Sequence, residues 1–153
     1  MDVNQKAPDF TLPDENGEPV TLSSFKGKPV VLFFYPRANT PGCTIEACGF
    51  RDQYGKLIRA GLTVLGISPD TPKAQKKFQE KYQLPYTLLA DADKEVAKLF
   101  DVLKEKNMYG KKVMGIERTT FLIGPDGTLA QVWRKVKPEG HAEQVLSEVR
   151  AHK

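Results

Sequence analysis

The chain has 153 residues, of which 40% are hydrophobic and 27% are charged, so it is long enough for one domain with a hydrophobic core and has the composition of a globular protein. Its 23 basic and 19 acidic residues give a formal net charge of +4. The lysines at 73, 76, 77 and 81 recur at helical spacing, and we interpret them as a solvated helix face. The mild basicity therefore does not predict a nucleic-acid partner.

The longest apolar run, Val30–Tyr35, has six residues and is much too short to span a bilayer. Residues 1–6 also lack the apolar stretch of a signal peptide. We therefore expect a cytoplasmic protein without a membrane partner, folded as a single domain over residues 1–153. Two cysteines in such a reducing compartment are more typical of catalysis than of a structural disulfide.

The first half of the chain alternates strand and helix signals. Residues 10–12 and 20–22 flank an Asn16-Gly17 turn and predict a hairpin. Val30–Tyr35 predicts a strand buried on both faces, and from Cys43 onward apolar residues at helical spacing predict a helix that stops at Gly61. The inward face of this helix is expected to carry Ala47, Phe50, Tyr54, Leu57 and Ile58.

The second half continues the alternation. We expect a strand over 62–68, a helix over 72–82, a strand over 87–90 and a helix over 94–100 that Asp93 caps and that buries Leu99. The polar stretch 104–115 predicts a loop. Residues 119–123 and 128–136 predict a hairpin, and the last helix buries Ala142, Val145, Leu146 and Val149. This order of elements predicts an α/β protein with a central mixed β-sheet flanked by helices on both faces.

Cys43 lies at a chemically informative position. Pro36, Pro41 and Gly42 end the buried strand, so the sulfur is expected in the first turn of the following helix. Unpaired N–H groups and partial positive charge at a helix N-terminus favour a thiolate, which is the nucleophilic form of cysteine. The polar, proline-rich surroundings also lead us to expect Cys43 outside the apolar core, where it would only be a small hydrophobic residue.

Cys48 follows five residues later. On a continuous helix the two Cα atoms are about 8–9 Å apart, whereas a disulfide needs about 7 Å or less. A permanent disulfide is therefore not expected, but a reversible one is compatible with unwinding of the first helical turn.

At these residues the sequence resembles a known family. Pro36, Thr40 and Cys43 match the P-x-x-x-T-x-x-C signature of peroxiredoxins, and the chain is similar to the Q type, also called bacterioferritin comigratory proteins. The further matching segments are residues 7–10, 40–44, 46–48, 50–52, 108–112 and 115–121. The resemblance covers nearly the whole chain and implies a thioredoxin-like fold with an N-terminal hairpin.

The resemblance also implies a site and a reaction. Arg118 alone would be interpreted as a surface arginine in an ion pair, but its match to the family's arginine places its guanidinium beside the Cys43 sulfur. Cys43 would attack a hydroperoxide, assisted by Thr40 and Arg118 and enclosed by Pro36. Cys48 would resolve the resulting sulfenic acid as an internal disulfide. Thioredoxin or a related dithiol protein would reduce it, in a monomer without cofactor or metal.

Other interpretations remain open at this stage. Glu46 and Arg51 either orient Arg118 or form local pairs, Tyr35 either lines the substrate's path or packs in the core, and His141 and His152 are expected at the surface. Two further functions are a general thiol-disulfide oxidoreductase, for which C-x-x-C would be typical, and a thioredoxin-fold metal chaperone, for which the cysteine spacing is unsuited.

Overall fold

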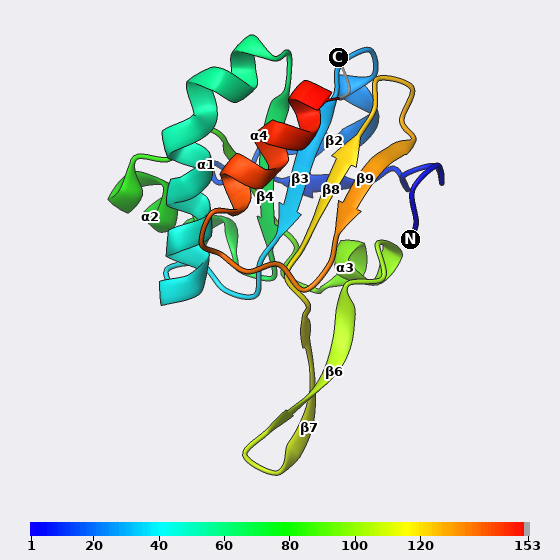
Figure 1. Cartoon of the computed structure of the whole chain (residues 1–153). Coiled ribbons are helices and arrows are strands. Elements are labelled where there is room, and N and C mark those ends of the chain that lie inside the picture. Colours follow the sequence, from blue (N-terminus) through cyan, green and yellow to red (C-terminus); the bar gives the residue numbers. More distant parts are fainter. Residues whose placement is uncertain (152–153) are drawn as a thin grey trace.

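The computed structural model describes residues 1–151 and contains a central five-stranded sheet in the order β5-β4-β3-β8-β9 (Figure 1). Three parallel strands, β3 (Val30–Phe34), β4 (Thr63–Ser68) and β5 (Thr87–Ala90), form one half of the sheet. The antiparallel strands β8 (Thr119–Ile123) and β9 (Leu129–Trp133) form the other half. The predicted mixed sheet is confirmed.

β3 is the middle strand of the sheet, and all five of its residues are buried. It pairs in parallel with β4 and antiparallel with β8, so Phe34 lies opposite Ile67 on one side and Thr119 on the other. This register brings the carboxyl end of β3 next to the residues that precede β8. Chain segments far apart in sequence therefore meet at this edge of the sheet.

One face of the sheet is covered by three helices: α1 (Pro41–Arg59), α2 (Pro72–Tyr82) and α4 (His141–Ala151). Their apolar side chains form one cluster with the sheet residues that point to this side, and this cluster includes Val31, Phe33, Phe50, Leu57, Phe78, Leu122 and Val145. Figure 1 shows α1 and α4 lying side by side over the sheet. None of the helices within residues 1–151 is long and apolar enough to cross a membrane.

The other face is covered by the N-terminal hairpin of β1 (Thr11–Pro13) and β2 (Pro19–Thr21), the 3-10 turn η1 (Leu22–Phe25) and α3 (Glu95–Leu99). The hairpin was expected from the sequence and is confirmed. Its side chains and those of α3 join a second cluster, which contains Phe10, Leu22, Phe34, Val96, Phe100 and Phe121. The sheet is therefore enclosed between two apolar layers.

Residues 104–115 do not form the expected loop. They form most of an antiparallel hairpin, β6 (Leu103–Met108) and β7 (Lys111–Ile116), that is paired only with itself and projects from the body of the molecule (Figure 1). Tyr109 and Gly110 form its tip with φ angles of 53° and 79°. Because both faces of most of this ribbon meet water, its sequence lacks the alternation that identifies a half-buried strand.

Three details of the helices differ from expectation. Ile58 and Leu99 are 47% and 50% exposed instead of facing the core. The start of α3 is capped mainly by the buried Asp91, whose carboxylate accepts hydrogen bonds from the N–H groups of Val96 and Ala97 at 3.2 and 2.9 Å. Asp93, the predicted cap, accepts only a longer bond from the N–H of residue 95, at 3.3 Å.

Candidate active site

Cys43 is the third residue of α1, the helix that follows the central strand β3. Thr40 is the N-cap residue, with extended backbone angles, and Pro41 opens the helix with a fixed φ angle. The N–H of Thr44 donates to the carbonyl of Thr40 at 2.9 Å. The predicted position of Cys43 in the first helical turn is therefore confirmed, and the unpaired N–H groups of that turn lie around it.

The sulfur environment is more apolar than the sequence suggested. Cys43 is only 1% exposed and belongs to the core cluster that contains Tyr35 and Ala47. The expectation that polar loop residues would keep Cys43 out of the core is wrong, because the first turn of α1 directs this side chain toward the sheet. The site is a buried sulfur with polar groups close by.

Arg118 is the polar partner of this sulfur. Its Nη2 donates to Sγ of Cys43 at 3.4 Å, and its Nη1 donates to Oε1 of Glu46 at 2.9 Å. Arg118 lies just before β8, which pairs antiparallel with β3. The sheet register therefore joins two residues that are 75 positions apart in sequence.

Glu46 holds the guanidinium from the next turn of α1. Its side chain is fully buried, and Oε2 has no hydrogen-bond partner among the described residues. Burial raises the pKa of Glu46 to about 7, although the positive charge of Arg118 acts in the opposite direction. Burial alone would lower the pKa of Arg118, but the adjacent Glu46 and Cys43 raise it.

The loop before α1 is fixed by contacts that the sequence did not reveal. The carboxylate of Asp70, after β4, accepts hydrogen bonds from the N–H of Ala38 at 2.7 Å and from the hydroxyl of Ser68 at 2.7 Å. Asn39 has a φ of 61°, a conformation that asparagine tolerates better than most residues. No local sequence pattern identifies Asp70, because its partner lies 32 residues away.

Thr40 and Pro36 lie in the loop that precedes Cys43, as predicted, and the hydroxyl of Thr40 is bonded to the backbone of this loop. Its hydroxyl donates to the carbonyl of Arg37 at 2.8 Å. Pro36 is half-buried between β3 and α1. The structure therefore places Arg118 in contact with both Cys43 and Glu46, whereas the hydroxyl of Thr40 is engaged by the carbonyl of Arg37.

Cys48 lies within α1, half-buried and not joined to Cys43 by a disulfide. Burial raises the pKa of Cys48, and Asp52 adds to this effect while Arg51 opposes it. Because α1 is continuous from residue 41 to residue 59, the separation of about 8–9 Å between the two Cα atoms applies. A bond between the two sulfurs requires local unwinding.

The remaining predicted residues have mixed outcomes. Arg51 bonds to Asp52 and to the carbonyl of Tyr82, so it does not orient Arg118. Tyr35 is buried, and its hydroxyl donates a hydrogen bond to Oε1 of Gln75 at 2.5 Å. Of the two roles considered for Tyr35, the structure shows packing in the core.

His141 is also buried, contrary to expectation, whereas His152 lies outside the described residues. The ring of His141 bonds to Thr120 at 2.8 Å and to Gln144 at 3.0 Å. Burial lowers the pKa of this histidine, the positive charge of Arg118 lowers it further, and the bond to Gln144 acts in the opposite direction. Within residues 1–151, no three His, Cys, Asp or Glu side chains gather as a set of metal ligands.

A cysteine in the first turn of a helix, with a guanidinium hydrogen-bonded to its sulfur, is the arrangement expected of a thiol-dependent redox site. The chain belongs to the AhpC/TSA family, which matches residues 3–132. It is 47% identical over 146 residues to peroxiredoxin Bcp of Bacillus subtilis, an alignment that covers 95% of this chain and 93% of the relative.

Solved structures agree with this assignment. A peroxiredoxin Q structure from Xanthomonas campestris superposes with a TM-score of 0.93 at 41% identity and covers all of both chains. The bacterioferritin comigratory protein of the same organism, studied for its alkyl peroxide reduction activity, gives a TM-score of 0.90 at 43% identity over 94% of this chain and 91% of that chain. The thioredoxin-like fold and the Q-type peroxiredoxin assignment are both confirmed, and the protein is a thiol-dependent peroxidase.

Proposed function

We propose that this peroxiredoxin reduces hydrogen peroxide and organic hydroperoxides with Cys43 as the attacking thiolate and Arg118 as its electrostatic partner. The observation that carries the assignment is the 3.4 Å contact between Nη2 of Arg118 and Sγ of Cys43 in the first turn of α1. The N-terminus of α1 and the guanidinium of Arg118 both favour a negative charge on the sulfur of Cys43. Cys48 lies further along α1, and although the positive charge of Arg51 acts on its thiol, burial outweighs that effect and raises the pKa of Cys48.

The reaction starts when the thiolate attacks the terminal oxygen of the hydroperoxide. The S–O bond forms as the O–O bond breaks, and the departing oxygen takes a proton and leaves as water or an alcohol. Negative charge grows on that oxygen, so donors that are already in place lower the barrier. Arg118 and the N–H of Cys43 supply such donors, Thr40 adds its hydroxyl after turning from Arg37, and Pro36 shields the pocket from water.

The product is a sulfenic acid on Cys43, which Cys48 resolves. The thiol of Cys48 attacks the Cys43 sulfur, a disulfide forms, and water leaves. This step follows unwinding of the first turns of α1, because the intact helix keeps the two sulfurs apart.

A thiol reductant then returns the enzyme to its starting state. We propose thioredoxin or a related dithiol protein, because exchange with a dithiol regenerates both thiols in one cycle. We further propose a monomer without nucleic-acid or membrane partners that works in the cytoplasm, where reductants of this kind keep thiols reduced.

Mass spectrometry after one equivalent of hydrogen peroxide tests this assignment. We expect rapid loss of two hydrogens in the wild type, as the Cys43–Cys48 disulfide, and a trapped sulfenic acid on Cys43 in Cys48→Ser. Cys43→Ser should not react. Thiols that react no faster than free cysteine, together with fast exchange with protein disulfides, would instead identify a general thiol-disulfide oxidoreductase.

A further inference from the structure

A cavity of about 390 Å³ lies at the end of the sheet opposite to Cys43. It is formed where the start of β3 meets the end of β8, whereas α1 and its cysteine follow the other end of β3. Its volume falls within the range of about 300–1,000 Å³ that is typical of small-molecule sites. The peroxidase reaction makes no use of it.

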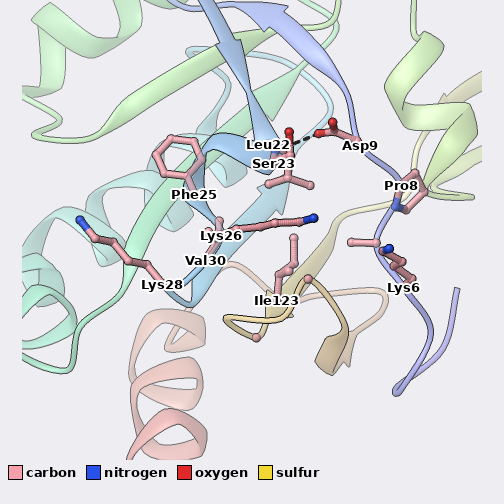
Figure 2. A pocket seen from close by; sticks show the side chains of 13 residues that line it. Lys6, Pro8, Asp9, Leu22, Ser23, Phe25, Lys26, Lys28, Val30 and Ile123 are labelled. Carbon is pink, nitrogen blue, oxygen red and sulfur yellow. Dashed lines mark hydrogen bonds between the residues drawn. The ribbon is translucent and has the colours of Figure 1, made fainter.

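The walls of this cavity are mainly apolar. Leu22 and Phe25 of η1, Val30 of β3 and Ile123 of β8 contribute side chains, and Ala7 and Pro8 close the side formed by the N-terminal segment (Figure 2). That segment is anchored, since the N–H of Ala7 donates to the carbonyl of Gly127 at 2.9 Å. The cavity thus has an anchored N-terminal wall and an apolar floor in which Leu22, Val30 and Ile123 are buried.

Three lysines, Lys6, Lys26 and Lys28, also line the cavity. In the described part of the chain, none of the three ammonium groups has an ion pair or a side-chain hydrogen bond. Figure 2 shows Lys26 extending toward the segment that carries Lys6, whereas Lys28 extends the other way. Positive charge therefore converges on an apolar space from two sides.

Asp9 is the one acidic residue in the lining, and its carboxylate is already engaged. Oδ1 accepts hydrogen bonds from the N–H groups of Phe10 at 3.0 Å and Ser23 at 2.9 Å. These hydrogen bonds leave the negative charge of Asp9 in place, and Lys26 interacts with that charge, but three lysines against one carboxylate still give the lining an excess of positive charge. Because the low-dielectric walls of a concave site focus this field, an anion gains more there than on an open surface.

We propose that this cavity binds a small organic anion with an apolar body, of the class of medium-chain carboxylates. The alkyl chain would contact Leu22, Val30 and Ile123, and the carboxylate would lie between the ammonium groups of Lys6 and Lys26. The carbon stems of both lysines add to the apolar contact. This site is independent of the assignment of Cys43.

Isothermal titration calorimetry with octanoate, below its micelle concentration, tests the proposal. We expect saturable binding of one octanoate per chain and an affinity about tenfold lower in Lys6→Ala/Lys26→Ala, since each partly exposed charge pair contributes a few-fold. Lys73→Ala, on the exposed surface of α2, is the matched control and should change the affinity less than twofold. Octanol, which has the same chain without the charge, should bind as weakly to the wild type as octanoate binds to the double variant.

The position of the site is checked by amide chemical shifts during the same titration. Shifts should concentrate at Ser23, Gly124 and Gly127 and leave the first turn of α1 unchanged. Absence of saturable binding, equal affinity for octanol and octanoate, an unaffected double variant, or shifts centred on Cys43 would each overturn the proposal. All three replaced lysines are exposed, so the variants are expected to fold.

Discussion

Glu46 and Arg118 form the most constrained pair in the site. The carboxylate of Glu46 is buried, and only one of its oxygens has a partner among the described residues. A buried charge with half of its hydrogen bonds satisfied is costly, which is why burial raises its pKa to about 7 despite the adjacent guanidinium. The pair therefore positions Arg118 at the expense of stability.

Replacing Glu46 with Gln should make unfolding less dependent on pH. The pKa of about 7 in the folded protein exceeds the ordinary value of 4.5, so the folded state binds the proton more tightly. This contribution to stability is complete below pH 4.5 and is lost as the pH rises toward 7 and beyond. The wild type should lose on the order of 3 kcal/mol relative to Glu46→Gln over this window.

Urea denaturation at a series of pH values measures this difference. Glu139→Gln, a change at an exposed glutamate, is the control and should parallel the wild type. Parallel curves for the wild type and Glu46→Gln would show that burial does not raise the pKa of Glu46.

Gly42 leaves room for the guanidinium. A Cβ atom at this position would lie 3.2 Å from Nη2 of Arg118 and 3.5 Å from Cγ of Pro138. Gly42→Ala should therefore displace Nη2 from the Cys43 sulfur and slow the reaction with peroxide by about tenfold, since small misplacements at a reacting centre have large effects on rate. Stopped-flow fluorescence measures this rate, and a rate equal to that of the wild type would contradict the predicted role of the contact.

At the scale of elements, α1 has two tasks that oppose one another. Intact, it presents Cys43 at its first turn, and in the proposed reaction it must unwind so that Cys48 reaches the oxidised sulfur. Besides Gly42 in its first turn, the helix contains Gly49 and Gly55 in its interior, which lower its stability by roughly 1 kcal/mol each relative to alanine. Gly49 directly follows Cys48, the proposed resolving cysteine, so we expect the unwinding to extend to about this position.

Gly49→Ala should slow disulfide formation about fivefold without changing the rate of sulfenic acid formation. A Cβ atom there would meet Ala142 at 3.6 Å, an ordinary contact, so the substitution stabilises the helix without a clash. A Cβ atom at Gly55 would meet nothing within 4 Å. Gly55→Ala therefore stabilises the same helix without a clash, about one turn and a half beyond Gly49. Rapid-quench mass spectrometry separates the two steps, and equal effects of both variants would contradict unwinding that is confined to the first turns.

The elements differed in how well the sequence predicted them. β3, β4, β5 and β8 were predicted within about one residue, because apolar runs bounded by proline, glycine or aspartate have few alternatives. The bounds of α2 were also predicted, since Pro72 suits the first turn of a helix. The β6–β7 hairpin was missed because neither face is buried, and a strand of that kind has no periodic signal. Burial of His141 was missed for a related reason, since its partner Thr120 lies on a distant strand.

Prediction of the candidate active site was limited in the same way, because contacts between distant segments leave no local pattern. The helix start at Cys43 follows from local sequence, but the contact with Arg118 depends on the antiparallel register of β3 and β8, which no local pattern encodes. Only the resemblance to peroxiredoxins placed Arg118 at the sulfur. Asp70, whose role depends on the loop opposite, had no signal at all.

At the scale of the whole molecule, the sheet is held between two aromatic layers. On the α1 side, Phe33 stacks on Phe50 with ring centroids 4.6 Å apart, and the ring of Tyr86 meets Phe33 edge to face. Gly66 of β4 lies beneath this group. A Cβ atom there would be 2.9 Å from both Phe33 and Leu88, so the close packing depends on the missing side chain.

Gly66→Ala should lower the free energy of unfolding by about 1–3 kcal/mol, because extra volume in a filled core forces side chains out of their preferred rotamers. Chemical denaturation measures the change. Gly55→Ala adds the same methyl group in open space and should act in the opposite direction. A Gly66→Ala variant as stable as the wild type would show that the ring of Phe33 can move without cost.

No third strand joins the β6–β7 hairpin within the described residues, and unlike the other two-stranded sheet, β1–β2, it projects from the body of the molecule instead of packing on the central sheet (Figure 1). A two-stranded ribbon in water is marginal by itself, and Tyr109 at its tip is completely exposed. Its backbone amides should therefore exchange their hydrogens with solvent through local fraying, while those of β3 exchange only when the whole protein unfolds. Amide hydrogen exchange should therefore be fast in the β6–β7 hairpin and slow in the central sheet of the same molecule.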